Sequence, residues 1–271
     1  MLPALFVSHG APTFPLTDAP ARHFLEHLTA DLAERPRAIL VISAHWETAA
    51  PAVTSSAINE TIHDFSGFPA ELYAIRYPAP GSAWLVDRVA GIVEEAGGAI
   101  TRVPARGLDH GAWVPLRLIY PEADIPVVQL SVQTAQGPEY HYRLGQLLAP
   151  LRDDGVLIVG SGSFTHDLSS FREYYNALHA PAPAWVDQFA EWMTAAIDEG
   201  RIDDLLAYRS RAPHARRNHP TEEHLLPLFV ALGAGDSRGD SGGGSGRAEH
   251  LHASTTHGIL RMDAFAFGAA A

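Results

Sequence analysis

The chain has 271 residues, of which 46% are apolar and 18% charged, a composition typical of a globular protein with a sizeable core. Its 31 acidic and 19 basic residues give a formal net charge of -12, which excludes electrostatic attraction to nucleic acid or to an anionic membrane. The absence of cysteine excludes disulfides, thiolate nucleophiles and cysteine-ligated metals. All 19 basic residues are arginine, so lysine Schiff-base chemistry is excluded as well.

The amino-terminal segment predicts neither a signal peptide nor a membrane span. Residues 1–9 carry no basic region, and their apolar run is short. We therefore expect a cytoplasmic protein that acts on small molecules, with no nucleic-acid or membrane partner. The composition leaves a monomer or a small homo-oligomer open.

Histidines follow three apolar segments that predict buried strands. Residues 2–8 lead to His9, residues 37–43 lead to His45, and residues 156–160 lead through a short loop to His166. Open α/β sheets place their ligands at the carboxyl ends of the strands. Three imidazoles at such ends indicate a metal site.

Between these strands, periodic apolar spacing predicts helices. This alternation predicts a single α/β domain over residues 1–271, with a central, mostly parallel or mixed sheet flanked by helices and a metal site at the carboxyl ends of the strands. Helices are expected over residues 18–34, 82–96, 140–151, 183–199 and 221–232, further strands over 99–103 and 125–132, and a closing edge strand over 257–267.

The carboxyl-terminal third contains one more candidate ligand. The helix expected over residues 221–232 carries His224 in its first turn, and Pro227 inside it should bend it. Residues 234–247 are rich in glycine and serine and predict a flexible insertion within the domain.

Other histidines have plainer explanations. His23 and His27 lie four residues apart on the first helix, which suits a metal but suits a solvated helix face better. The segment from His63 to Pro69 predicts a loop, either lining a pocket or on the surface. His219 has no assigned role, and the remaining histidines are expected to be surface or structural, namely His141, His179, His214, His250, His252 and His257.

Six short motifs surround the candidate histidines. They are Ser8-His9-Gly10, Ser43-Ala44-His45-Trp46, His63-Asp64-Phe65, Asp109-His110-Gly111-Ala112-Trp113, Ser163-Phe164-Thr165-His166-Asp167 and His219-Pro220-Thr221-Glu222-Glu223-His224. In this order, from residue 1 to about residue 267, the chain resembles the class III extradiol ring-cleavage dioxygenases of the LigB-like superfamily, most closely their DOPA dioxygenase branch. The resemblance implies a single α/β domain, a non-haem Fe(II) and a catechol that O2 opens beside one hydroxyl.

The resemblance also implies roles for single residues. His9, His45 and His224 match the metal ligands, with the adjacent Glu222 and Glu223 as the competing assignment for the third position. His166 matches the acid/base histidine, which is sometimes placed at the metal as well. The positions expected to contact substrate are His63, His110 and His166, and His110 is expected to assist catalysis as a polarising partner of His166.

Elementary chemistry agrees with this division. Ground-state O2 reacts poorly with a closed-shell catechol, so a redox metal is required. Three protein ligands leave positions open for the catechol oxygens and O2. A histidine that is not a ligand can carry protons near neutral pH. We expect Fe(II) in the functional form, and Zn(II) as its competitor in the isolated protein.

Two other functions stay open at this point. A non-catalytic, Memo-like binding protein would share the fold with an altered metal site, and a zinc hydrolase would need only three histidines and an open position. The sequence also leaves open which catechol is the substrate. L-DOPA is one candidate, and its cleavage would lead towards betalamic acid or muscaflavin.

Overall fold

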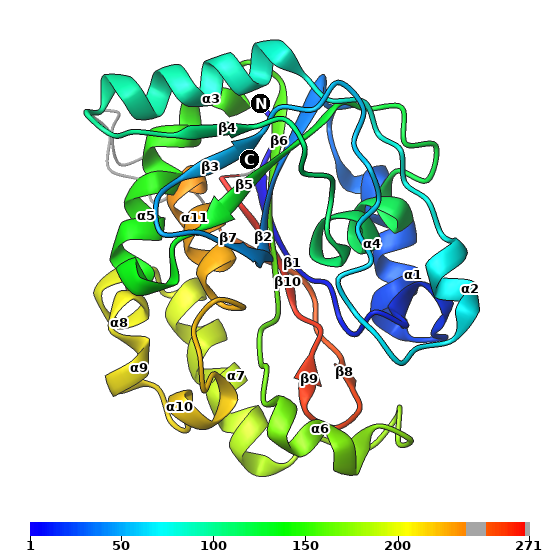
Figure 1. Ribbon diagram of the computed structural model, residues 1–271. Helices are drawn as coiled ribbons and strands as arrows, with labels where there is room; N and C mark the ends of the chain where they lie inside the picture. The colour runs from blue at the N-terminus through cyan, green and yellow to red at the C-terminus, as the bar shows by residue number, and fades with distance from the viewer. Residues whose placement is uncertain (237–247, 269–271) are drawn as a thin grey trace.

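Long apolar segments of the chain pair as the central strands of an eight-stranded sheet (Figure 1). The structure is a computed structural model that describes residues 1–236 and 248–268. The strand order is β4-β3-β5-β2-β6-β1-β10-β7. The strands are β1 (Ala4–Ser8), β2 (Ala38–Glu47), β3 (Ala52–Thr54), β4 (Thr101–Val103), β5 (Val127–Val132), β6 (Val156–Gly162), β7 (Ala248–His252) and β10 (Ala264–Phe267), with β8 (Thr255–Thr256) and β9 (Leu260–Arg261) in a separate hairpin.

The middle of the sheet is parallel. β1 and β2 both run parallel to β6, and β5 runs parallel to β2. Strands covered on both faces need continuous apolar sequence, and every residue of β1, β5 and β6 is buried. The pairs β1–β10, β10–β7 and β3–β5 are antiparallel. The predicted α/β domain with a mostly parallel or mixed sheet is therefore confirmed.

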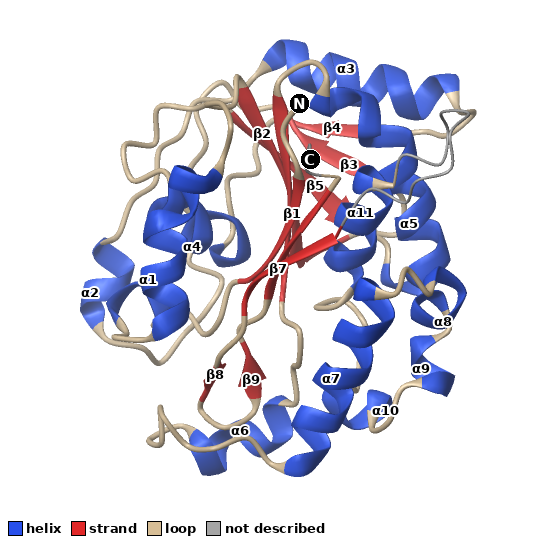
Figure 2. Ribbon diagram, turned by 180° about the vertical axis from the view of Figure 1, so that it is seen from behind, coloured by secondary structure: helices blue, strands red, loops and turns tan. Residues whose placement is uncertain are grey.

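Helices cover both faces of the sheet (Figure 2). Alternate side chains of β2 separate the two sides. Leu40 belongs to the apolar cluster that includes residues of α3, α5, α7 and α11, whereas Val41 belongs to the cluster that includes residues of α1 and α4. Within the described ranges, none of these helices has both the length and the apolar character needed to cross a bilayer. The helices are α1 (Pro20–His27), α2 (Ala70–Ala74), α3 (Ala83–Glu95), α4 (His110–Ile119), α5 (Gly137–Leu148), α6 (Leu168–Tyr174), α7 (Ala184–Asp198), α8 (Ile202–Leu206), α9 (Tyr208–Arg211), α10 (Ala215–Asn218) and α11 (Leu226–Gly235).

The expected edge strand over residues 257–267 is wrong. The segment divides between hairpin strand β9 and β10, and β10 pairs with β1 on one side and β7 on the other. The edge strand on this side of the sheet is β7, whose sequence Ala-Glu-His-Leu-His lacks the β-branched residues typical of strands. Apolar alternation shows which face of a strand is buried, but it does not show how many neighbours the strand has.

The helix expected over residues 221–232 starts later than predicted. α11 begins at Leu226, so His224 precedes the helix. Pro227 occupies the first turn, where its missing N–H costs no helical hydrogen bond and no bend is needed. The helix continues to Gly235, so residues 234 and 235 do not belong to the predicted insertion, and residues 237–247 of that insertion lie outside the described residues.

The first helix is also shorter than expected. α1 ends at His27 and a 3-10 turn, Leu28–Asp31, follows it, so the helix predicted over residues 18–34 does not continue to residue 34. The short strand β3 has no counterpart among the predicted strands. Three residues are too few to show a period-2 pattern in the sequence.

Backbone contacts at the end of β6 bring two distant histidines to the same edge of the sheet. Ser8 at the end of β1 lies opposite Gly162 at the end of β6. The His9 amide donates to the Gly162 carbonyl at 3.0 Å, and the Ser163 amide donates to the His224 carbonyl at 2.9 Å. A Cβ atom on Gly162 would overlap that His224 carbonyl oxygen. Only glycine at position 162 allows this approach.

We expect Gly162→Ala to destabilise the fold by about 1–3 kcal/mol, because the added methyl group must displace the backbone at His224. Zinc affinity should fall with it, since His224 moves away from its neighbours. Chemical denaturation and equilibrium dialysis would measure the two effects. Gly91→Ala is the matched control, because its Cβ would meet nothing within 4 Å, and a helical alanine should add up to about 1 kcal/mol of stability. Equal behaviour of the two variants would contradict the role given to Gly162.

Candidate active site

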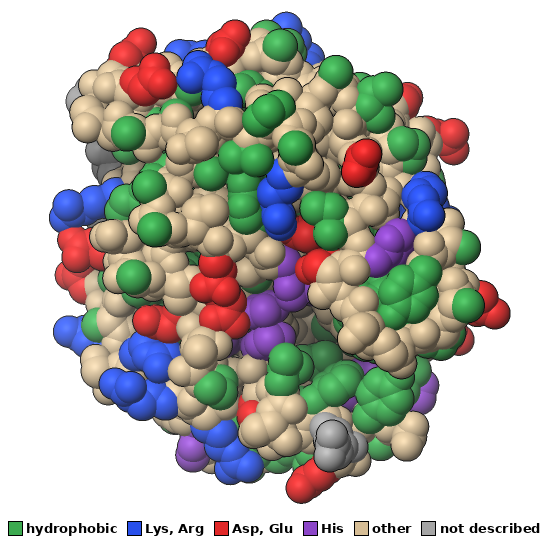
Figure 3. Space-filling view, viewed as in Figure 1, with side chains coloured by type: hydrophobic (Ala, Val, Ile, Leu, Met, Phe, Trp, Pro, Cys, Tyr) green, Lys and Arg blue, Asp and Glu red, His purple; other side chains and the backbone are tan. Residues whose placement is uncertain are grey.

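Three histidines from distant parts of the chain meet beyond the carboxyl ends of the central strands. His9 follows β1, His45 lies near the end of β2, and His224 precedes α11. The Nε2 atoms of His9 and His45 are 3.1 Å apart, and those of His45 and His224 are 3.2 Å apart. All three nitrogen atoms lie within 4.8 Å of one another. Figure 3 shows histidine side chains gathered in a hollow on this face.

Each of these imidazoles has an oxygen atom near its other nitrogen. The Nδ1 atom of His224 lies 2.9 Å from Glu223 Oε1, and Nδ1 of His45 lies 3.6 Å from Asp64 Oδ2, which is longer than a hydrogen bond but places a negative charge beside that nitrogen. The Nδ1 atom of His9 lies 3.1 Å from the hydroxyl of Ser161, which donates its own proton to the Gly111 carbonyl and therefore accepts from the ring. Proton placement at Nδ1 leaves all three Nε2 lone pairs facing one another.

This donor set fits a metal ion. Two nitrogen ligands bound at about 2.1 Å and at right angles to each other are separated by about 3 Å, which agrees with the spacing of the Nε2 atoms. Burial, followed by repulsion from neighbouring imidazoles, holds the pKa of His9 and that of His224 well below the usual value, and lowers the pKa of His45 to about 4. The imidazoles are therefore neutral at neutral pH, as metal ligands must be.

A cavity of about 270 Å³ opens beside the three histidines. Small-molecule sites are typically apolar pockets with a few converging polar groups, and this cavity has polar imidazoles at one end and largely apolar walls elsewhere. This volume and these lining residues suit a small aromatic ring with polar groups on one edge. Besides the three histidines, the lining residues are Gly10, Ala11, Pro12, Phe68, His110, Ser163, His166, Leu168, Phe171 and Leu260.

His166 borders this cavity and stacks on His224. Their ring centroids are 3.4 Å apart with an interplanar angle of 14°. The backbone amide of His166 donates to the Asn218 carbonyl at 2.8 Å, and no protein group of the described residues hydrogen-bonds to its ring nitrogens. Burial, followed by the nearby His219 and His45, lowers the pKa of His166 to about 3. The ring is therefore neutral, with its nitrogens available to a ligand in the cavity.

His110 also borders the cavity, but it has a carboxylate partner. Its Nδ1 atom lies 2.9 Å from Asp64 Oδ2, and its backbone amide donates to Asp64 Oδ1 at 2.9 Å. Its ring lies 3.9 Å from that of His45, measured between centroids. Since Nδ1 faces Asp64, His110 directs its Nε2 edge towards the cavity.

His63 lies outside the residues that line the cavity. Its Nε2 atom is 3.2 Å from the Ile75 carbonyl, and its ring packs beside Phe65, Tyr73 and Trp113. Contact between His63 and substrate stays a prediction. The aromatic group it belongs to includes Phe65, whose ring packs against Phe68 of the cavity wall.

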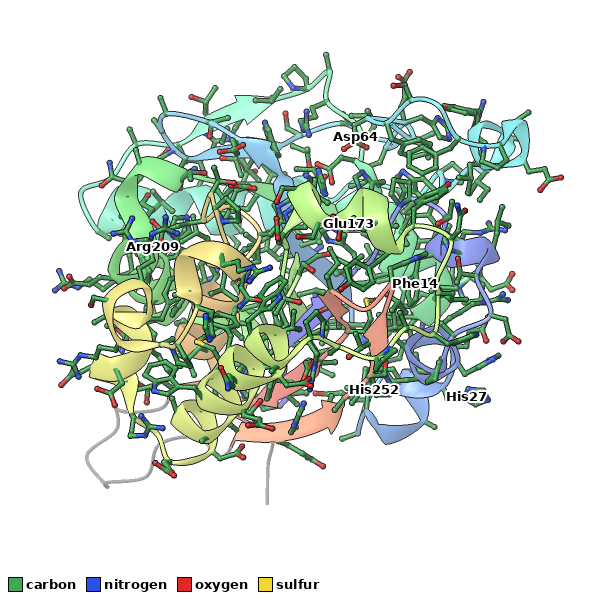
Figure 4. All side chains as sticks on the ribbon, turned by 90° about the horizontal axis from the view of Figure 1, so that it is seen from below. Phe14, His27, Asp64, Glu173, Arg209 and His252 are labelled. Atoms are coloured by element: carbon green, nitrogen blue, oxygen red, sulfur yellow. The ribbon has the colours of Figure 1, made fainter. Side chains whose placement is uncertain are left out.

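Histidines that were not assigned to the site have other partners. His23 pairs with Asp18 at 2.8 Å, and Figure 4 shows the labelled His27 at the periphery of the molecule. His219 is buried, with Nε2 3.0 Å from the Phe164 carbonyl. His141 is also buried, with Nδ1 2.7 Å from the Gly137 carbonyl.

A buried carboxylate supports His45 from behind, and the sequence analysis missed it. Asp109 accepts from the Ser43 hydroxyl at 2.6 Å and from Arg106 at 2.8 Å. Ser43 in turn accepts from the His45 amide at 3.2 Å, and Arg106 donates to the His45 carbonyl at 3.3 Å. Asp109 and Asp64 stand in two of the six motifs but were given no role, and Ser161 lies outside all of them.

Comparison with known proteins decides the family. Residues 3–259 match the family model described as the catalytic LigB subunit of aromatic ring-opening dioxygenase. The chain belongs to this family. Across 265 residues it is 44% identical to the 4,5-DOPA dioxygenase extradiol of Beta vulgaris, covering 97% of this chain and 95% of that protein.

Bacterial proteins are similar to this LigB-family chain as well. The 4,5-DOPA dioxygenase extradiol of Escherichia coli K12 is 38% identical over 240 residues, covering 88% of this chain and 86% of that protein. A crystal structure of an uncharacterized protein from Escherichia coli K12 has a TM-score of 0.77 at 31% identity, covering 99% of this chain and 100% of that one. The predicted fold, family and enzyme class, an extradiol dioxygenase, are confirmed.

The low pKa values predict how metal binding by this LigB-family protein depends on pH. Protons compete with a metal only where the ligand imidazoles titrate. With the pKa of His45 at about 4 and not at the usual 6.5, zinc affinity should stay nearly constant from about pH 8 to about pH 6 and fall as the pH approaches 4. Equilibrium dialysis across this range would measure it. A steep loss of affinity already near pH 6.5 would show that the ligands titrate normally.

Proposed function

We propose that the protein is a non-haem Fe(II)-dependent extradiol dioxygenase that opens the ring of a catechol such as L-DOPA with O2 and incorporates both oxygen atoms. One observation carries this proposal. The Nε2 atoms of three neutral imidazoles lie close together beside a cavity that is large enough for an aromatic ring. The names of the similar proteins from Beta vulgaris and Escherichia coli support L-DOPA as the first substrate to test.

His9, His45 and His224 would hold the iron. When bound, the iron supplies electron transfer between the catechol, which is spin-paired, and ground-state O2, because the two react poorly without a metal. The third ligand is assigned to His224 because its Nε2 atom faces His45. Glu223 instead lies at the Nδ1 side of His224, and Glu222 accepts from the Tyr208 hydroxyl at 2.9 Å.

The cavity walls would hold the catechol ring. Phe68, Phe171 and Leu260 would pack against it and exclude water, while its two hydroxyl groups point towards the histidines. The way the side chain of L-DOPA lies among these residues would determine which bond beside the hydroxyl pair is cleaved. Cleavage would lead towards betalamic acid in one orientation and towards muscaflavin in the other.

His166 would move the proton. As a neutral imidazole with unbonded ring nitrogens in the cavity, it would accept a proton from a catechol hydroxyl and return it to an oxygen atom of the opening ring. His110 would polarise the same hydroxyl through Nε2, held in place by Asp64. His63 would contribute to substrate binding through the aromatic group behind Phe68.

The proposal predicts oxygen consumption with catechols. Protein loaded anaerobically with Fe(II) and then mixed with L-DOPA in air should form a yellow ring-opened product and consume one O2 per catechol. An oxygen electrode and absorption spectra would follow both. Zinc-loaded protein is the control and should show neither change, because Zn(II) has no redox chemistry. No oxygen uptake with any catechol would rule out the proposed reaction.

The assignment of roles predicts two classes of variant. His9→Ala, His45→Ala and His224→Ala should each lose iron and activity together. His166→Ala should keep its iron and bind catechol, but turnover should fall by roughly a hundredfold or more, the usual magnitude for general acid/base catalysis. Metal analysis and steady-state kinetics would separate the classes.

Glu223→Gln is the control for the third ligand, since the amide keeps the size of the side chain and removes its charge. If His224→Ala keeps iron while Glu223→Gln loses it, the site has two histidines and one carboxylate, and the assignment of His224 is wrong. Loss of iron from His166→Ala would likewise move His166 from proton transfer to metal binding.

A further inference from the structure

One carboxylate lies between a metal-facing imidazole and a substrate-facing one. Asp64 belongs to the segment between β3 and α2, and Figure 4 shows it well away from the labelled Arg209 and His27. Its Oδ2 atom is 2.9 Å from Nδ1 of His110 and 3.6 Å from Nδ1 of His45. Its Oδ1 atom accepts from the backbone amide of His110. Both oxygen atoms of Asp64 therefore face groups of the site.

The hydrogen bonds of Asp64 determine where its neighbours carry their ring protons. A carboxyl group is ionised near neutral pH, and the two oxygen atoms of Asp64 lie 2.9 Å from the ring Nδ1 and the backbone amide of His110. An ionised carboxylate can only accept hydrogen bonds. A neutral imidazole with its Nδ1 atom towards Asp64 must therefore carry its proton on that atom and leave Nε2 unprotonated.

We propose that Asp64 is a positioning residue that fixes His110 in the Nδ1–H form through two hydrogen bonds and favours the same form of His45 through its charge, 3.6 Å from Nδ1. This inference rests on the proposed function, because it assigns the exposed Nε2 of His45 to the metal and that of His110 to the substrate. The carboxylate thus couples the orientation of a ligand ring to that of a ring in the cavity. The 3.9 Å contact between the two rings gives them little freedom to turn independently.

The variant Asp64→Asn tests this arrangement sharply. The His110 backbone amide is a donor and needs the single amide oxygen of asparagine, so the NH2 group must face Nδ1 of His110 and Nδ1 of His45. An NH2 donor facing Nδ1 of His110 can form a hydrogen bond only if that Nδ1 atom carries no proton. Asparagine should therefore convert His110 to the Nε2–H form, with nearly the same shape and without the charge.

The main measurement needs no activity. In metal-free protein labelled with 15N-histidine, two-bond proton–nitrogen correlation spectra report which ring nitrogen carries the proton. We expect the Nδ1–H form for His45 and His110 in the parent protein, and the Nε2–H form for His110 in Asp64→Asn. Zinc affinity and iron-dependent turnover should each fall about 10–100-fold, the usual effect of removing the hydrogen-bond partner of a metal-binding imidazole.

Two control variants separate this role from loss of any carboxylate. Glu223→Gln removes a carboxylate at Nδ1 of His224 and should leave the proton of His110 in place. Asp18→Asn removes the exposed partner of His23 and should change neither metal affinity nor turnover. Circular dichroism would check that Asp64→Asn folds. If it does not, Asp64→Ala should show mixed proton placement at His110.

The outcomes distinguish the inference from the proposed function. If the parent protein shows no oxygen uptake, the reaction is wrong, but the spectra and the zinc affinity still decide the role of Asp64. If Asp64→Asn keeps the Nδ1–H form of His110 and binds zinc as the parent does, the role of Asp64 is wrong. Binding of two metal equivalents by the parent and one by Asp64→Asn would also overturn it, because Asp64 would then be a ligand.

Discussion

The backbone junction at Gly162 and Ser163 is the contact on which the site depends. It joins His9 to β6 through one hydrogen bond and His224 to β6 through another, although the two histidines are separated by most of the chain. The side chain of Ser161, one residue earlier, meets Nδ1 of His9. A shift of the β6 register by one residue would place these groups on the opposite face of the sheet. The parallel register of β1 and β6, together with the missing Cβ atom at Gly162, therefore determines the geometry of the site.

Charge is arranged around the site and not within it. His9, His45, His166 and His224 are neutral imidazoles, whereas the carboxylates of Asp64, Asp109 and Glu223 lie behind the inward-facing rings and accept hydrogen bonds from them or from their supporting residues. Neutral ligands leave the charge of a bound divalent ion uncompensated, which favours a substrate that binds as an anion. A catechol that gives up a proton meets this requirement. In the proposed enzyme the outer carboxylates would orient the rings and leave the positions for substrate and O2 free.

The sequence predicts the strand-borne part of the site better than its surroundings. His9 and His45 follow uninterrupted apolar runs, and such runs end at the same edge of a parallel sheet. His224 lies in a non-helical segment before α11, so its place followed from resemblance and not from periodicity. The contacts of Ser161, Asp64 and Asp109 span 152, 46 and 66 residues, and no local pattern encodes them. β7 and β3 were missed because one lacks β-branched residues and the other has only three residues.

Two histidines face the same cavity in opposite surroundings, and this difference separates their roles. His110 has an ionised carboxylate 2.9 Å away, which fixes its ring and would offset a positive charge on it. Burial, followed by the nearby His219 and His45, lowers the pKa of His166 to about 3, and no described residue hydrogen-bonds to its ring nitrogens. The sequence predicted a histidine that carries protons near neutral pH, whereas this ring is neutral when substrate arrives and holds a proton only weakly. Under the proposed assignment, His110 would orient a catechol hydroxyl with a ring that Asp64 fixes, and His166 would take the proton. Phe68, Phe171 and Leu260 line the cavity that both imidazoles face.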